Sequence, residues 1–259
     1  MRREREPEVM ASRQEAQEYA DLASRRIDWV LDAFVRQVTQ ACPRWASCLD
    51  LGTGTGHVPA RLAKAARPGQ AGNGSRTIVG VDLSPEMLRV ASSWPAPAGV
   101  RLEWVEGDIS RLPFADNSFD LVLSHLVLHH LDDPVAFLNE VNRVARHGAA
   151  IFIRDVVRPN SPFHAWLTEH LFTPGYTRAQ RRMYADSIRS AFTVREIASA
   201  LRQSELRGCH VARCFSTHVD VVRTQDGVSR YQSLAEAPII ERFTVDWARR
   251  RTGQRAASF

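Results

Sequence analysis

Apolar residues recur along this chain with a helical spacing at first and in short continuous runs afterwards. Between residues 12 and 41 they lie three and four residues apart, as at Val30, Leu31 and Phe34, which gives one apolar face and predicts one or two helices. Pro43 ends that segment. The later apolar runs are short enough to be buried strands, and several of them are followed by a segment with helical spacing. The pattern therefore predicts strands that alternate with helices.

The predicted elements define a fold class. Apolar runs predict strands at 46–51, 77–81, 100–105, 119–124, 149–156, 209–215 and 218–223. Helical spacing predicts helices at 57–66, 85–91, 134–145 and 193–204. Ser84 and Pro85 suit the cap and the first position of the helix 85–91. We expect an α/β, Rossmann-like, mostly parallel seven-stranded sheet with helices on both faces, an N-terminal helical cap and a helical insertion after strand five.

The length of 259 residues, with 44% hydrophobic and 24% charged residues, fits one domain. We expect a single domain, 1–259, with parts that follow the predicted elements. These parts are an N-terminal helical cap (1–44), a cofactor-binding core (45–157), a lid insertion (158–192), a C-terminal helix with strands (193–223) and a tail (224–259).

The basic charge does not by itself indicate nucleic acid. The net charge is +5 and the pI is near 9.4, but Lys64 is the only lysine and the arginines are spread along the chain. The dense run Arg249–Arg251 is interpreted as a solvated tail. No apolar run has the length of a membrane span, and the N-terminus lacks the pattern of a signal peptide. We expect a cytoplasmic protein, with no membrane contact and nucleic acid an unfavoured partner.

The cysteines predict no metal site. Cys42, Cys48, Cys209 and Cys214 contain no CxxC pair, which is typical of free thiols. Period-two alternation places Cys209 on the face opposite Cys214 and its neighbouring histidines, so packing explains the Cys/His cluster better than metal binding.

The strongest chemical signal is the turn after the first strand, Cys48-Leu-Asp50-Leu-Gly52-Thr-Gly54-Thr-Gly56. Glycines let the backbone turn sharply and approach a ligand without a Cβ in the way. The following helix offers unpaired N–H groups to that ligand, and parallel sheets bind ligands at the carboxyl ends of their strands. A glycine-rich turn alone does not distinguish a nucleotide site from a structural turn.

Acidic residues at three strand ends narrow the choice of ligand. Asp50, Asp82 and Asp108 each follow an apolar run. The glycine spacing is G-x-G-x-G and not the dinucleotide pattern G-x-G-x-x-G. A carboxylate can accept hydrogen bonds from two ribose hydroxyls, and another can accept one from the adenine amine. This arrangement favours S-adenosyl-L-methionine over a dinucleotide.

From residue 48 to residue 155 the chain resembles the class I S-adenosylmethionine-dependent methyltransferases, in their small-molecule branch with quinone-biosynthesis-like members. The motifs that carry the resemblance are Leu49–Gly56, Gly80–Met87, Gly107–Asp108, Leu112–Asp120, Leu128–Pro134 and Glu140–Gly148. Flanking segments around Glu6 and Asp155 resemble one bacterial subgroup more weakly. That subgroup commonly has asparagine after Ser124, where this chain has His125.

The resemblance implies the cofactor contacts. The turn at Gly52, Gly54 and Gly56, with Asp50 nearby, would hold the methionine part, and the carbonyl of Ser124 would accept from its amine. The ribose would bind Asp82. The remaining expected contacts are Leu83 and Met87 beside the ribose, and Asp108 and Ile109 at the adenine edge. For Met87, a packing role in the core is the competing interpretation.

Methyl transfer depends mainly on holding the acceptor at attack distance in a dry site, with a base needed only when the acceptor must lose a proton. His125 and His129 are the candidate bases, and His130 also lies near the expected pocket mouth. A packing role is the competing interpretation for His129 and His130. We expect His125→Ala to lower turnover far more than cofactor binding.

The aromatic-rich insertion, together with the N-terminal helices, is expected to shape an apolar acceptor site, or else simply to pack as a helical cap. The partner is expected to be a small-molecule acceptor, with a homodimer as a further possibility. The alternatives are an RNA or protein methyltransferase, a non-catalytic S-adenosylmethionine-binding protein and a nicotinamide oxidoreductase.

Overall fold

The computed structural model describes residues 1–6, 12–25, 28–66, 75–214 and 217–225. Its centre is a seven-stranded sheet in the order β3-β2-β1-β4-β5-β7-β6. The strands are β1 (Ser47–Leu51), β2 (Arg76–Asp82), β3 (Val100–Glu106), β4 (Phe119–His125), β5 (Ala145–Val156), β6 (His210–Cys214) and β7 (His218–Arg223). The pairs among β1 to β5 are parallel, and β7 is antiparallel to both β5 and β6. The predicted fold class is confirmed.

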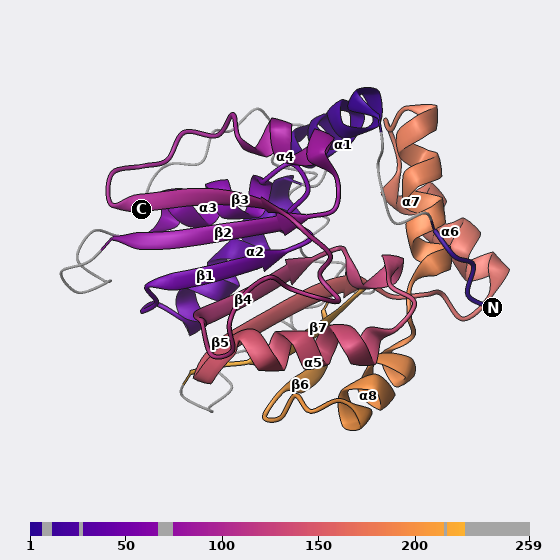
Figure 1. Cartoon of the computed structure of the whole chain (residues 1–259). Helices are drawn as coiled ribbons and strands as arrows, with labels where there is room; N and C mark the ends of the chain where they lie inside the picture. Colours follow the sequence, from indigo (N-terminus) through magenta and orange to yellow (C-terminus); the bar gives the residue numbers. More distant parts are fainter. Residues whose placement is uncertain (7–11, 26–27, 67–74, 215–216, 226–259) are drawn as a thin grey trace.

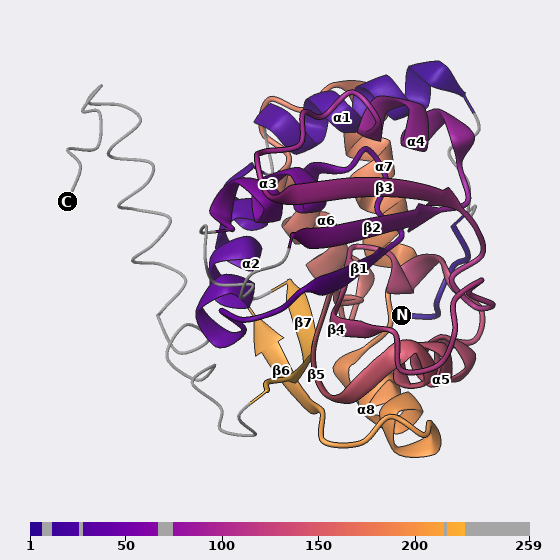
Figure 2. The same ribbon diagram turned by 60° about the vertical axis from the view of Figure 1, so that its left-hand side comes forward.

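Helices cover both faces of this sheet (Figures 1 and 2). They are α1 (Arg13–Arg25), α2 (Asp28–Ala41), α3 (His57–Ala65), α4 (Pro85–Ala91), the 3₁₀ helix η1 (Leu128–His130), α5 (Pro134–Val144), α6 (Pro162–Phe172), α7 (Arg178–Ser190) and α8 (Val194–Gln203). A hydrophobic core lies on each face of the sheet, and successive side chains of β1 point alternately into one core and the other. Leu49 and Leu51 pack in the core that includes α5 and α8, whereas Cys48 packs in the core that includes α2 and α3.

Most predicted boundaries agree with the structure to within a few residues, and the largest differences have local causes. The helix α4 occupies the predicted range because Ser84 accepts a hydrogen bond from the Met87 N–H and Pro85 begins the helix. The strand β5 begins at Ala145, four residues before the prediction, because Ala145 still pairs with Phe119 across an irregularity in the ladder.

The insertion at 158–192 contains the two helices α6 and α7, which pack against each other. Most of the predicted tail, including Arg249–Arg251, lies outside the described residues. None of the helices in the described ranges combines the length and apolar character that a bilayer span requires.

Candidate functional site

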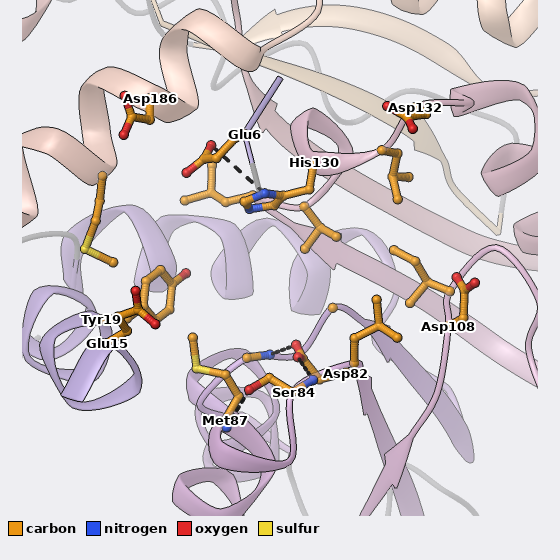
Figure 3. Close-up of a pocket in the computed structure, with 18 of the residues that line it drawn as sticks. Glu6, Glu15, Tyr19, Asp82, Ser84, Met87, Asp108, His130, Asp132 and Asp186 are labelled. Atoms are coloured by element: carbon orange, nitrogen blue, oxygen red, sulfur yellow. Dashed lines mark hydrogen bonds and ion pairs between the residues drawn. The ribbon is translucent and has the colours of Figure 1, made fainter. Parts of the chain in front are cut away.

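A cavity of about 700 Å³ lies where the parallel strands end, which is the edge at which such sheets bind ligands. The glycine turn after β1 and the loops after β2, β3 and β4 form its floor. Three further segments complete the walls: the N-terminal residues with Glu6, the helix α1 with Tyr19, and the helix α7 with Met183 and Asp186. Figure 3 shows Tyr19 and Glu15 on one side of this cavity and Asp82, Ser84 and Met87 below it.

The turn after β1 has the backbone that its glycines allow. Gly52 and Gly54 have φ values of 65° and 53°, in the left-handed region. A Cβ on Gly52 would lie 2.4 Å from Cγ2 of Val127, so the loop after β4 packs directly on this residue. A Cβ on Gly54 would meet only Tyr19, at 3.7 Å. The turn therefore presents bare backbone to the cavity on the side of Tyr19.

Asp82 connects this turn to the end of β2. Its Oδ2 accepts a hydrogen bond from the Gly54 N–H at 2.7 Å, and its Oδ1 accepts one from the Ser84 N–H at 2.9 Å. Burial raises the pKa of this carboxyl above its usual value, and the backbone donors oppose the shift. Asp82 thus holds the two loops together while its carboxylate lines the cavity.

The sequence between β1 and β5 matches a known family over residues 49–153, and that family is described as a methyltransferase domain. The match runs from β1 to β5, so the core of this chain is similar to methyltransferases. A demethylmenaquinone methyltransferase of Roseiflexus castenholzii is 36% identical to it over 155 residues, which make up 58% of this chain and 61% of the relative. The match thus spans about three fifths of that curated relative.

Solved structures share this fold. A SAM-dependent methyltransferase from Aquifex aeolicus is 18% identical and superposes with a TM-score of 0.56, covering 82% of this chain and 97% of its own. The plantazolicin methyltransferase BamL, solved with a triazolic desmethylPZN analog and SAH, is 16% identical and has a TM-score of 0.61, covering 95% of this chain and 86% of its own. The class I fold expected from the sequence motifs is therefore present.

The structure brings most of the predicted cofactor residues together. Those that line the cavity are Gly52, Gly54, Asp82, Leu83, Met87, Asp108 and Ile109. Three others do not line it. Gly56 caps α3, where a Cβ would lie 2.8 Å from Trp104 and 2.9 Å from Ala91, so it allows close helix packing. Ser124 is buried and its hydroxyl donates to the Leu51 carbonyl at 3.1 Å.

Asp50, the third, lies below the glycine turn. Its carboxylate is 2% exposed and accepts a hydrogen bond from the Thr53 hydroxyl at 2.7 Å. Burial raises the pKa of Asp50 to about 7, although the Thr53 hydrogen bond opposes this shift and Asp82 adds to it. Asp50 borders a small space of about 20 Å³ next to the turn, and its contact with a cofactor stays a prediction.

His125 lies beneath the cavity and not at its mouth. It borders the same small space as Asp50, and its ring packs 4.9 Å from the ring of Phe34. Burial, with a further contribution from Arg154, lowers the pKa of His125 well below its usual value, so the ring is neutral at neutral pH. Its role as a base stays a prediction.

His129 belongs to a buried carboxylate–imidazole pair. Its Nδ1 lies 2.7 Å from Oδ1 of Asp155, and its backbone N–H donates to Oδ2 of the same carboxylate at 2.6 Å. Burial alone would lower the pKa of His129, but the Asp155 carboxylate outweighs it and the pKa is raised. His129 does not line the cavity, whereas His130 and Glu6 do, and Glu6 lies between the two rings and α7.

Residues far away in the sequence complete the site, and none of the sequence motifs predicts their roles. Arg3 donates from Nη2 to the carbonyls of His129 and Leu131, at 2.9 and 2.7 Å, and from Nε to that of Ser190 at 2.6 Å. It thereby connects η1 to the end of α7. Tyr19 is another wall residue whose role the motifs do not predict. Burial raises the pKa of Tyr19 to about 12, so its phenol stays protonated beside the glycine turn. No local pattern marks Arg3, and the weak subgroup resemblance of the segment that begins at Tyr19 assigns that residue no role.

The cavity is strongly acidic. Its carboxylate residues are Glu6, Glu15, Glu18, Asp82, Asp108, Asp132, Asp133 and Asp186. Within the described lining, Arg182 is the one arginine and no lysine is present. A surface with this excess of carboxylates favours a cationic ligand and disfavours polyanions.

Proposed function

We propose that this protein is an S-adenosyl-L-methionine-dependent methyltransferase that acts on a small-molecule acceptor. The observation that carries the proposal is the acidic cavity at the carboxyl ends of β1, β2 and β3, bordered by bare glycine backbone at Gly52 and Gly54 and by the carboxylates of Asp82 and Asp108. A sulfonium and an ammonium group both carry positive charge, which suits this lining.

The residues present fit the cofactor. Gly54 has no Cβ, and the space that a Cβ would occupy is open up to the ring of Tyr19. The backbone of the turn can therefore lie close to the methionine part of the cofactor. Asp82 accepts hydrogen bonds from backbone N–H groups, including those of Gly54 and Ser84, and the two oxygens together keep acceptor capacity for a ribose hydroxyl. Asp108 and Ile109 follow β3 at the position expected for the adenine edge. When bound, the cofactor supplies an electrophilic methyl group on sulfur.

The protein's own task is to hold the acceptor and exclude water. A cavity of about 700 Å³ is within the range of small-molecule sites, which is roughly 300 to 1,000 Å³. Apolar side chains on the loop after β4 and on α7, including Val127, Leu131 and Met183, offer contacts to an acceptor ring. The Roseiflexus relative is named as a demethylmenaquinone methyltransferase, and this name supports an aromatic acceptor that carries oxygen atoms.

We extend the proposal to the insertion at 158–192, whose helix α7 lines the cavity with Ala179, Arg182 and Met183. Together with α1 it would act as a lid over the acceptor. Binding of cofactor and acceptor should then slow amide hydrogen exchange in α7 and leave the distant strand β6 unchanged. Equal exchange in α7 with and without both ligands would remove the lid from the proposal.

The competing functions fit less well. An RNA substrate would bring phosphates to a cavity lined by carboxylates, which repel them. A non-catalytic cofactor-binding protein would bind S-adenosyl-L-methionine without turnover. A homodimer and a cytoplasmic location stay predictions from the sequence.

The deciding experiment measures binding and transfer separately. Calorimetry should detect binding of S-adenosyl-L-methionine and S-adenosylhomocysteine but not of NAD. Asp82→Ala should weaken both affinities at least ~10-fold, which corresponds to about 1.4 kcal/mol of binding free energy. Glu18→Gln, also at the cavity, is the control. Labelled methyl transfer into a metabolite extract would then identify the product by mass. Affinity for NAD in place of these ligands would overturn the proposal, and binding without any transfer would leave the non-catalytic alternative.

A further inference from the structure

Three potential metal ligands meet at the wall of the cavity, on segments that are far apart in sequence. Oε2 of Glu6 lies 3.5 Å from Nε2 of His129 and 4.0 Å from Nδ1 of His130. One ligand atom of each residue lies within 4.8 Å of the other two. Figure 3 shows the Glu6 carboxylate directed at the His130 ring, with the cavity below them.

The contacts of His129 with Asp155 fix the tautomer of its imidazole ring in the form that can bind a metal ion. Both oxygens of Asp155 accept backbone N–H groups, from His129 at 2.6 Å and from Val156 at 2.6 Å, so this carboxylate acts as an acceptor. The Nδ1 of His129, 2.7 Å from Oδ1 of Asp155, therefore carries the proton. In the neutral ring the lone pair is then on Nε2, which lies 3.5 Å from Oε2 of Glu6.

The Nε2 atom of His129 is buried and has no hydrogen-bond partner among the described residues, while the whole residue is only 2% exposed. A buried ring nitrogen without a partner is costly unless something binds it. A carboxylate on one ring nitrogen and a metal on the other is a recurring arrangement, because the carboxylate fixes the tautomer and the ring orientation.

Glu6 is held in place as a ligand would be. Ser190, at the end of α7, donates its hydroxyl to Oε2 of Glu6 at 3.1 Å, and Ser187 donates to Oε1 at 3.5 Å. Arg3 anchors the preceding backbone to η1 and α7. The carboxylate is thus positioned by two hydroxyls of α7 and by the anchored backbone at Arg3.

We propose that Glu6, His129 and His130 bind a divalent transition-metal ion, and the donor set assigns zinc. Two imidazoles and one carboxylate are a known zinc set that leaves a fourth position open. Tetrahedral bonds of about 2.0–2.1 Å place ligand atoms roughly 3.4 Å apart. The observed separations of 3.5 and 4.0 Å from Glu6 need only small side-chain movements to reach that geometry.

The open coordination position suggests what the metal would do. This role rests on the proposed methyltransferase function. Glu6 and His130 line the 700 Å³ cavity, so the fourth position faces the space for the acceptor. There the ion would bind an oxygen atom of the acceptor, orient it and lower the pKa of a hydroxyl, whose proton passes to water. The surrounding carboxylates tolerate this added positive charge beside a cationic cofactor.

The test is metal binding in the absence of cofactor, so it stands or falls separately from methyl transfer. Protein freed of metal with a chelator is titrated with Zn²⁺ against a chromophoric competitor, and we expect one tight equivalent. Glu6→Gln and His130→Asn should each weaken that equivalent at least ~10-fold. Asp155→Asn removes a carboxylate that contacts His129 but is not itself a proposed ligand, and it should weaken the equivalent about 10- to 100-fold. Glu18→Gln is the matched control, because it removes another cavity carboxylate outside the cluster.

A second measurement guards against variants that misfold. Co²⁺ should give visible absorption bands of a four-coordinate site in the wild-type protein, and these bands should disappear in Glu6→Gln while the far-ultraviolet circular dichroism is unchanged. Failure of the folded wild-type protein to bind either ion, or wild-type affinity in both Glu6→Gln and His130→Asn, would overturn the metal site.

Discussion

Arg154 on β5 and Asp220 on β7 form a two-pronged ion pair inside the protein. They are directly opposite in the antiparallel ladder, with Nε 2.7 Å from Oδ1 and Nη2 2.8 Å from Oδ2. Arg154 is fully buried and Asp220 is 1% exposed. The amide oxygen of Gln37 on α2 also accepts from the guanidinium. The pair thus joins the antiparallel edge of the sheet to its parallel body.

Removal of one partner should be strongly destabilising. Asp220→Ala leaves an uncompensated buried guanidinium, and we expect a loss of about 3–5 kcal/mol in the free energy of unfolding, measured with urea. Asp116→Ala is the control, because the side chain of Asp116 is 67% exposed in its pair with Arg143 and its loss should cost less than about 1 kcal/mol. Similar losses for both variants would contradict the expectation.

Gly52→Ala should cost more than Gly99→Ala. Both glycines have positive φ, 65° and 79°, so each substitution carries backbone strain of about 1–2 kcal/mol. At Gly99 nothing lies within 4 Å of the added Cβ, whereas at Gly52 it would lie 2.4 Å from Val127. Overpacking should add about 1–3 kcal/mol and distort the cofactor turn. Urea unfolding and calorimetry with S-adenosylhomocysteine measure the two effects.

Val127→Ala provides the complementary variant. In the Gly52→Ala background it removes both methyl groups that the new Cβ would strike, so it should restore part of the stability and part of the cofactor affinity. No recovery of either quantity would show that the clash with Val127 is not the cause.

Asp50 should make stability fall as pH rises. Burial raises its folded pKa to about 7 from 3.8, so between pH 4 and pH 7 the native state binds more protons than the unfolded state. The fold is therefore most favoured below pH 4 with respect to this group and loses up to about 4 kcal/mol as the pH passes 7. Asp50→Asn should gain on the wild type by a few kcal/mol between pH 5 and pH 8 in urea unfolding. Parallel pH profiles would contradict the shift.

A substitution at His125 can separate a role as a base from a role in packing. If its neutral imidazole accepts the acceptor's proton, His125→Phe should lower kcat by about 10²- to 10⁴-fold, because a base typically contributes that much, while cofactor affinity stays within about twofold. Phenylalanine keeps an aromatic ring against Phe34, which lies 4.9 Å away. Retained turnover in this variant would mean that the ring only packs.

The fold follows from local patterns, because each predicted element carries its own signals. Ser84 and Pro85 mark the start of α4, and buried runs such as Cys48–Leu51 mark the strands. The helices α6 and α7 could not be placed individually, because the scattered aromatic and polar residues of the insertion obscure the helical period. The capping box of Thr177 and Gln180 at the start of α7 is a local signal that could have located that helix.

The candidate site likewise contains some residues that could be predicted from the sequence and some that could not. Asp82 and Asp108 are predictable because Asp82 is the last residue of β2 and Asp108 follows the end of β3 by two residues, at the same edge of the sheet. The contact between Glu6 and His129 is not, since no sequence period relates residues 123 positions apart. Only the packing of the N-terminal segment on η1 and α7 brings them together.

The hydrogen bonds of Arg3 also bear on how the protein reaches its native state. They span 126 positions to His129 and 187 to Ser190, so they are among the most non-local contacts of the chain. Contacts that close such long loops form late, after local helices and neighbouring strands. During synthesis the first residues must wait until Ser190 has left the ribosome. Assembly of the cavity wall is therefore a late folding event, and destabilising variants of this segment should delay the appearance of binding more than that of secondary structure.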